Sequence, residues 1–411
     1  MMAETVSRRV ASPKYLIGAF FLLAGCGGSA GGAGTGGAGG TGGASSTGTI
    51  GAATSSGTTA TGTSSSATGS GGAAATAAAS GTTSGAGGVP STGGSSGTTG
   101  GSTTGSGGSG PSGSCGSQSF TLNSNPFGCE FAWGTNGDRG DRSSYLHFIT
   151  TWVGYEYGQG RENDCDGCGL AGELRSSGAM ATYYAYFIGY SPLPDCNTHP
   201  EPPNLCTDGA QWVRDNRDYV VSLYGGYARR TYQASPDKPV VWLLEGDFVQ
   251  YTYDEQNNAL SMQELGDLAR DITCAIKSNM PNAVVAMNHS PWLSNEVTDA
   301  FWGAMPLDVL DLVWTTGLGN NDGFIPENTD GESYNGRTAR YGYLNQLTGK
   351  QIVVDTSFGA SQADDSWTGI GATTLNQRIG DGVIAANVTQ PPGDYQSRVD
   401  GLTGQLSSVC Q

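Results

Sequence analysis

The stretch VVWLLEGDFVQY, residues 240–251, joins an apolar run to two acids. The run 240–244 has the length and the β-branched and aromatic content of a buried strand. Glu245 and Asp247 follow it directly and lie two residues apart. Carboxyl groups are seldom buried without a partner, so this pair marks the strand exit as a place where chemistry is done.

Seven further runs of similar character alternate with helical patterns along the chain. They are 131–134, 145–153, 182–190, 283–287, 312–315, 351–354 and 383–387. Strands that alternate with helices predict parallel βα units, and about eight units predict an α/β fold of the (β/α) barrel type with seven or eight strands, regular or distorted. An open doubly wound sheet is the alternative. In both folds ligands bind at the C-terminal ends of the strands.

The helices are predicted from capping and periodicity. Ser261-Met-Gln-Glu264 is a capping box, and apolar residues at helical spacing follow it. Ranges 208–231, 336–348 and 394–406 show similar patterns, the last more weakly.

The first 25 residues predict an export signal. Arg8, Arg9 and Lys14 precede an apolar stretch, 15–24, that is too short to span a bilayer. The stretch ends in Leu-Ala-Gly-Cys26, which resembles the lipobox of bacterial lipoproteins, in which the Cys is lipidated. An ordinary cleaved signal followed by a chance Cys is the alternative.

Two further segments follow the signal. Residues 26–114 are rich in Gly, Ser, Thr and Ala without apolar periodicity, so we expect the predicted lipidated Cys26 to be followed by a disordered tether. Its root-mean-square reach would be about 50 Å. Residues 115–411 are long enough for one large catalytic domain.

Charge and cysteine content narrow the possible partners. The chain has 36 acidic and 19 basic residues, a net charge of −17, which disfavours nucleic acid and favours a neutral substrate. Apart from Cys26, eight Cys remain, which in an exported protein predict disulfides. Cys165-Asp-Gly-Cys168 would be a weak zinc motif, so no metal or cofactor is expected. We expect a monomer that meets the membrane only through its lipid.

Acids also follow other predicted strands. Asp195, Asp355 and Asp394 join Glu245 and Asp247 in this position. Converging carboxylates in an acidic, exported, aromatic-rich domain predict glycoside hydrolysis, which needs one protonated acid and one ionised carboxylate. Each acid taken alone could equally cap a helix or bind loop amides.

Six short segments strengthen this hypothesis by their order along the chain. They are PDC 194–196, LLEGD 243–247, HSPWL 289–293, TGLGNNDGF 316–324, DTS 355–357 and PPGD 391–394. In this order they resemble the PDRDC, LxxEPD, HxGWL, TNxxNYNGW, DTSRNG and KPPGESDG segments of family 6 glycoside hydrolases, the inverting cellulases. The chain departs from them at Gly246, Phe358, Gln390 and Asp394, which affects the sugar contacts.

The resemblance implies roles for the acids. Asp247 would be the general acid, Asp355 the base and Asp195 a helper whose charge raises the pKa of Asp247. Glu245 would be a structural acid near the site. If strand geometry continued past residue 244, Glu245 and Asp247 would point to the same side.

The remaining candidate site residues would bind the sugar. Aromatic rings cover the apolar face of a pyranose, which makes Trp292, by resemblance, and Trp152, by position, candidate platforms. The other candidate contacts are His289, Asn320, Asp394 and Tyr190. The alternatives are a core aromatic residue, a structural His and, for Asp394, a helix N-cap.

The resulting hypothesis is an exported, cell-surface or outer-membrane lipoprotein that cleaves β-1,4-glucan internally with inversion. A secreted form is the alternative for its location. The alternatives for its function are a retaining glycosidase acting on another β-glycan and a non-catalytic glycan-binding surface lipoprotein.

Overall fold

A computed structural model describes residues 112–137, 144–196, 198–290, 293, 295–317, 341–356, 366–389 and 391–410. The predicted signal and lipidated Cys26 lie outside these ranges, as do Trp292 and Asn320. The hypotheses about them stay predictions.

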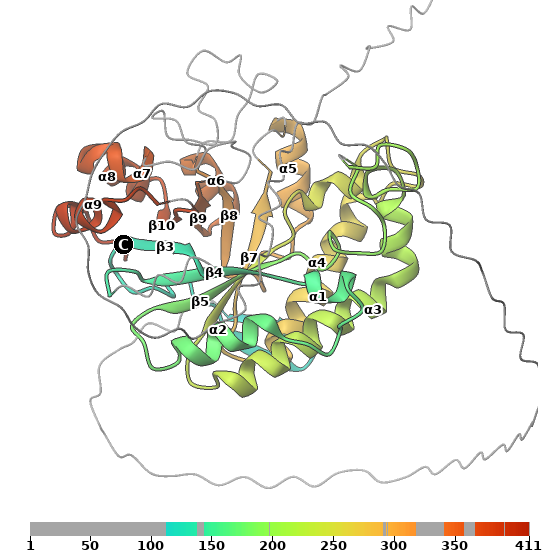
Figure 1. Ribbon diagram of the computed structural model, residues 1–411. Coiled ribbons are helices and arrows are strands. Elements are labelled where there is room, and N and C mark those ends of the chain that lie inside the picture. Colours follow the sequence, from blue (N-terminus) through green and yellow to red (C-terminus); the bar gives the residue numbers. More distant parts are fainter. Residues whose placement is uncertain are drawn as a thin grey trace, which may run out of the picture. The chain divides into compact units, whose positions relative to one another are not determined.

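Eight parallel strands close into a barrel in the order β10-β3-β4-β5-β6-β7-β8-β9 (Figure 1). Because each strand pairs with the next along the chain and β10 pairs with β3, the sheet has no free edge. This confirms the predicted barrel and fixes its strand number at eight. The strands are β3 (Ala132–Asn136), β4 (Phe148–Val153), β5 (Met180–Ala185), β6 (Val240–Leu244), β7 (Val284–His289), β8 (Leu312–Thr316), β9 (Gln351–Asp355) and β10 (Val383–Asn387).

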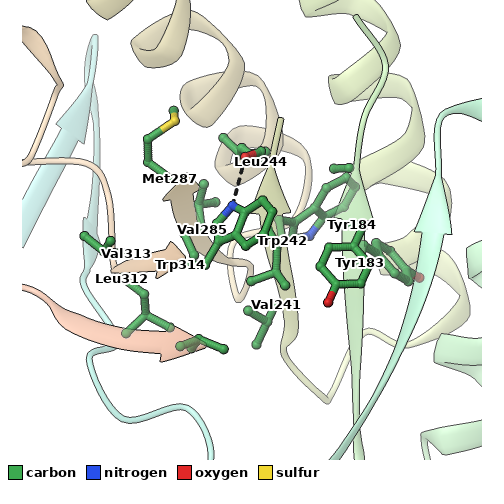
Figure 2. Packing of buried hydrophobic residues seen from close by; sticks show 14 of the residues in the cluster. Tyr183, Tyr184, Val241, Trp242, Leu244, Val285, Met287, Leu312, Val313 and Trp314 are labelled. Carbon is green, nitrogen blue, oxygen red and sulfur yellow. Dashed lines mark hydrogen bonds between the residues drawn. The ribbon is translucent and has the colours of Figure 1, made fainter. Parts of the chain in front are cut away.

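Side chains alternate between the barrel interior and the surrounding helices. Tyr183 contacts Tyr227 of a helix, with ring centroids 6.0 Å apart, whereas the next residue, Tyr184, contacts Trp314 of the non-adjacent strand β8 at 5.7 Å. The Trp314 indole N–H donates to the carbonyl of Leu244 at 2.9 Å (Figure 2). Strands buried on both faces explain why these runs are almost continuously apolar.

Helices follow most strands and cover the barrel. They are α1 (Tyr155–Gly158), α2 (Asp166–Leu174), α3 (Leu205–Ala234), α4 (Met262–Asn279), α5 (Asn295–Ala304), α6 (Tyr341–Thr348), α7 (Ser366–Gly369), α8 (Gly371–Gly380) and α9 (Tyr395–Leu402), with a 3-10 turn η2 (Phe248–Thr252). The capping box of α4 is confirmed, because Ser261 Oγ accepts from the Glu264 amide and the Glu264 carboxylate accepts from the Ser261 amide. Among these helices none is long and apolar enough to cross a bilayer.

A hairpin of β1 (Ser112–Cys115) and β2 (Gln118–Thr121) precedes the barrel. Its first strand begins inside the range predicted as a tether. A disulfide joins Cys115 to Cys274 of α4, and Phe120 lies 4.6 Å from the Lys277 ammonium. Asn123, just after the hairpin, donates its amide to Asp311 at the N-terminal end of β8. The hairpin is therefore attached at the N-terminal end of the barrel.

All eight expected cysteines form disulfides. The CxxC pair Cys165–Cys168 is bonded to itself, and the others are Cys115–Cys274, Cys129–Cys410 and Cys196–Cys206. The bridge to Cys410 attaches the end of the described chain to the segment before β3.

One predicted strand is too long. The run 182–190 was expected to continue to Tyr190, but β5 ends at Ala185. The amide of Ile188 donates to the Glu245 carboxylate at 2.8 Å, and Tyr190 closes a turn on Tyr186. Past Ala185 the chain thus forms a turn, and the buried Glu245 carboxylate accepts from one amide of that turn.

Candidate active site

The exit of β6 has an unusual backbone. Glu245 and Asp247 have φ values of +27° and +57°, in the left-handed region that side chains other than Gly seldom adopt. Strand geometry therefore ends at Leu244, and the expectation that the two acids point to the same side is wrong. Non-glycine residues in this region cost about 1–3 kcal/mol each and gather at functional sites.

Glu245 is directed towards the loop after β5 and towards α3. Its Oε1 accepts from the Ile188 amide at 2.8 Å and from the Tyr224 hydroxyl. Its side chain is buried, with 1% exposure of the residue. Burial raises its pKa to about 7, and the hydrogen bonds from the loop amides and Tyr224 oppose that rise. Glu245 thus joins β6 to the loop that follows β5.

Asp247 is directed towards the end of β7. Its amide donates to Asn288 Oδ1 at 3.0 Å, and its Oδ1 accepts from Ser290 Oγ at 3.1 Å. Burial raises its pKa to about 7, against the lowering effect of Ser290. We expected the charge of Asp195 to cause such a rise, but the structure attributes it to loss of solvation. A carboxyl with this pKa is largely protonated in mildly acidic solution.

Asp247 lines a pocket at the C-terminal end of the barrel. Aromatic side chains form most of the wall: Trp152 from β4, Tyr184 from β5, Tyr186 from the loop after it and Trp314 from β8. The Trp152 ring packs over Tyr184 with centroids 4.7 Å apart, yet the residue remains 37% exposed. The acid is therefore next to an open aromatic surface.

Asp355 ends β9, three strands from β6 around the barrel. Its Oδ2 accepts from Asn387 Nδ2 and its Oδ1 from Thr389 Oγ1, both at 3.2 Å. Donors at both oxygens hold this carboxyl group in one orientation. Asn387 also donates to the Tyr184 hydroxyl at 2.9 Å, and Tyr184 lines the pocket with Asp247. Asp247 and Asp355 are therefore at the same end of the barrel and are linked through Tyr184 and Asn387.

Asp195 lies in a turn. Its Oδ1 accepts from the Thr198 amide at 3.4 Å, next to the disulfide of Cys196 with Cys206. Its charge also reaches Tyr186, whose pKa is raised first by burial and then by Asp247, Glu245 and Asp195. Tyr186 is thus the link between Asp195 and the pocket.

Three other sugar-binding candidates lie in different surroundings. Tyr190 packs edge-on against Tyr186, with centroids 5.6 Å apart. His289 is buried, and its Nδ1 accepts from the Trp302 indole of α5 at 3.1 Å, so its ring packs between β7 and a helix, as expected of a structural His. Asp394 occupies the N-cap of α9 without a capping hydrogen bond and pairs with Arg398 at 2.9 Å.

Sequence reasoning missed four residues of the site. Tyr184 and Trp314 line the pocket, Tyr186 lines it from the loop, and Asn387 orients Asp355. The signal for Tyr184 was available, because it follows the strand alternation from Thr182, and Asn387 ends a predicted strand. Within the described ranges, no group of three His, Cys, Asp or Glu side chains could hold a metal ion.

No protein-family model and no curated protein matches the chain. Among solved structures, it is similar to a family 26 β-mannanase from Bacteroides ovatus, with 12% identity over 69% of this chain and 91% of that one and a TM-score of 0.44. A family 5 glycoside hydrolase from Prevotella bryantii gives 11% identity, 70% and 99% coverage and 0.40. The endoglucanase Cel6 from Mycobacterium tuberculosis gives 18% identity, 63% and 82% coverage and 0.33. The barrel assignment rests on the strand order, and these similarities carry no functional argument.

Proposed function

We propose that the barrel is a glycoside hydrolase whose general acid is Asp247. One observation carries the proposal. Asp247, a carboxyl group with its pKa raised to about 7, lines an aromatic pocket at the C-terminal end of the barrel, next to the partly exposed ring of Trp152. A general acid works best when its pKa is close to the working pH, and burial supplies that condition. The apolar face of a pyranose fits the exposed ring of Trp152.

The chemistry would begin at Asp247. Its proton passes to the glycosidic oxygen as the bond from that oxygen to the anomeric carbon breaks, so the leaving sugar departs as an alcohol. The left-handed backbone at Asp247 and the hydrogen bond from Ser290 fix the carboxyl against the pocket. The pocket's aromatic wall restricts water, which keeps the acid neutral until substrate arrives.

Asp355 would serve as the base. In an inverting reaction it removes a proton from a water molecule whose oxygen attacks the anomeric carbon from the opposite face. Asn387 and Thr389 hold the carboxylate in place. Inversion is proposed because the ordered motifs around Asp247 and Asp355 resemble those of family 6. A retaining mechanism is the competing possibility.

The substrate is proposed to be β-1,4-glucan, cleaved internally. Support comes from the same motif order and from the acidic chain, which disfavours anionic polymers. The changes at Gly246 and Asp394 affect positions near the sugar in the resembled family, so related β-glycans belong in the test.

We also propose that the protein is exported and lipidated at Cys26, so that the barrel acts outside the cell. Four disulfides in the described part of the chain support an oxidising compartment. Mass spectrometry of the membrane fraction, comparing the wild type with Cys26→Ser, tests the anchor. A soluble wild-type protein without lipid would contradict it.

The test of function uses the purified protein with β-1,4-glucan, β-mannan and xylan. NMR follows the anomer that forms first, before mutarotation, and Asp247→Asn is run in parallel. We expect the α-anomer from β-glucan with the wild type and almost no product with the variant. A first-formed β-anomer would replace inversion with retention, and inertness towards all three polymers with binding intact would favour a glycan-binding protein.

A further inference from the structure

A row of aromatic side chains leads away from the pocket along the exits of β4 and β5. Trp152 contacts Tyr186 with ring centroids 6.1 Å apart, and Tyr186 contacts Tyr190 at 5.6 Å. Tyr190 in turn contacts Tyr155 of α1 at 6.2 Å. Each contact is edge-to-face, an arrangement that stabilises aromatic pairs. The row therefore runs from the pocket to a surface helix.

An outer pair of rings lies beyond this row. Tyr157, two residues along α1, packs against Tyr219 of α3 with centroids 5.4 Å apart. Tyr219 is 39% exposed and Trp152 is 37% exposed, and within the described ranges these two are the large hydrophobic side chains that are most open to solvent. Tyr155 and Tyr157 lie two residues apart on α1 and so point to different sides of it. The rings thus form two groups, one on each side of α1, which we together call the aromatic rim: Trp152, Tyr186, Tyr190, Tyr155, Tyr157 and Tyr219.

Short helix α1 is held firmly by a buried acid. The Glu156 carboxylate accepts from the amides of Gly154 at 2.9 Å and Asp166 at 3.0 Å, and from the Tyr227 hydroxyl at 2.9 Å. The Arg161 guanidinium lies 5.9 Å from the Tyr155 ring and pairs with Asp166 at 3.4 Å. The outer pair is therefore presented on a fixed support, which reduces the entropy lost on binding.

The chemistry of the rim fits a neutral, hydroxyl-rich polymer. Burial raises the pKa of both Tyr157 and Tyr219, and the charge of one acid, Glu162, adds to the rise. Pyranose rings present apolar faces to aromatic rings and hydroxyl groups to carboxylates. A line of single rings is narrower than the continuous apolar patch that marks a protein partner.

We propose that the aromatic rim binds the polysaccharide chain where it leaves the pocket, with Tyr157 and Tyr219 as an outer sugar site. The inference rests on the proposed function for the identity of the ligand as a polysaccharide. It also deepens that function, because a site on the other side of α1 from Tyr155 is reached from the pocket only by a polymer. Polymers should therefore bind more tightly than oligosaccharides that are too short to reach Tyr219.

The test is affinity electrophoresis in native gels that contain soluble β-glucan, mannan or xylan, with Asp247→Asn as the background so that the polymer survives. Tyr219→Ala is the test variant. Arg229→Ala, an exposed change on the same helix, is the control. From the retardation at several polymer concentrations, we expect Tyr219→Ala to lower the affinity for the preferred polymer about fivefold, which is the effect of losing one aromatic contact. Arg229→Ala should match the background.

Two further measurements separate this proposal from the proposed function. Hydrolysis of a disaccharide or trisaccharide by Tyr219→Ala alone, with Asp247 intact, should equal that of the wild type. Retardation that depends on Tyr219 in a protein that hydrolyses nothing would refute the hydrolase and support the rim. Equal retardation of Tyr219→Ala and Arg229→Ala, or no retardation of the background by any polymer, would overturn the rim.

Discussion

Both ends of the barrel bury carboxyl groups, but they compensate them differently. At the N-terminal end, Asp311 has a buried cation beside it: Lys277 Nζ donates to its Oδ2 at 2.6 Å, and the two side chains are 1% and 2% exposed. The amides of Val285 and Asn123 also donate to this carboxylate. At the C-terminal end, Glu245 and Asp247 are held by neutral donors.

The difference indicates that the N-terminal end of the barrel serves stability, whereas the C-terminal end carries the proposed chemistry. Burial raises the pKa of Asp311, but Lys277 and the two amide donors oppose the rise, and the carboxylate joins β7, β8 and α4. At the pocket, loss of solvation raises the pKa of the half-buried Asp247 to about 7, and the effect that opposes this rise comes from the Ser290 hydroxyl and not from a cation. The strained backbone at Glu245 and Asp247 belongs to the same end.

The largest expected effect is at the C-terminal end. Asp247→Asn removes the proposed acid and should lower kcat on a β-glycan about 10²–10⁴-fold. The free energy of unfolding should change little, because the amide can still accept from Ser290. Steady-state kinetics and urea unfolding test this together. Asp271→Asn is the control, since this acid pairs with Arg217 of α3 in an exposed position on α4 and the variant should retain most activity.

The next effect is at the N-terminal end. Lys277→Met leaves Asp311 buried without its cation and should lower the free energy of unfolding by about 3–5 kcal/mol. Activity per folded molecule should not change. Arg270→Met breaks an exposed pair with Asp308 and should cost about 1 kcal/mol or less. If urea unfolding gave the same decrease in free energy for both variants, the buried pair would contribute no more to stability than the exposed one.

A third prediction concerns pH. Glu245 has its pKa raised from 4.5 to about 7, so the folded state keeps a proton that the unfolded chain releases, and stability falls as pH rises between these values. Glu245→Gln cannot ionise. Its free energy of unfolding should rise relative to that of the wild type as pH increases from 4 to 8, by about 1–3 kcal/mol at pH 8.

Glu264 serves as the control for this prediction, because its pKa is shifted in the opposite direction. The hydrogen bonds from Arg214, followed by the Ser261 amide, lower the pKa of Glu264 to about 2, so its contribution is present at neutral pH and is lost as pH falls. Glu264→Gln should therefore be less stable than the wild type at pH 7 and should approach it as pH falls from about 4.5 to 2. If the free energies of unfolding of Glu245→Gln and Glu264→Gln, each relative to the wild type, changed with pH in the same direction, the proposed difference between the two carboxyl groups would be contradicted.

The smallest effect concerns the aromatic wall. Trp152→Ala removes the exposed ring beside Asp247 and should raise KM about five- to tenfold, with a smaller change in kcat. Steady-state kinetics on the preferred polymer measure both constants. Trp152→Phe keeps a ring and should recover much of the affinity. A fall in kcat alone would place Trp152 outside substrate binding.

The fold was largely predictable because strands buried on both faces leave continuous apolar runs in the sequence, of which 240–244 is the clearest. The run at 182–190 was predicted to be a strand throughout because Tyr186, Phe187 and Ile188 are as apolar as the strand residues before them. The turn that they form after β5 is held in part by the Glu245 carboxylate, 57 residues from Ile188, which accepts from the Ile188 amide. Periodicity does not report such a distant contact.

The site was predictable in part. Acids at strand exits pointed to Asp247 and Asp355 because parallel strands bring their C-terminal ends together. The direction of each side chain was not predictable: His289 turns to Trp302 outside the barrel, and Glu245 turns to α3. These choices depend on which helix packs behind each strand.

The central claim is that the carboxyl of Asp247 keeps its proton close to neutral pH, and an NMR titration measures this directly. With aspartate labelled at the carboxyl carbon, Glu245 is silent, and comparison with Asp247→Asn identifies the signal. We predict a carboxyl that titrates near pH 7 in the wild type and is missing from the variant. A signal that disappears with Asp247 but titrates at the ordinary value, about 4, would contradict the account.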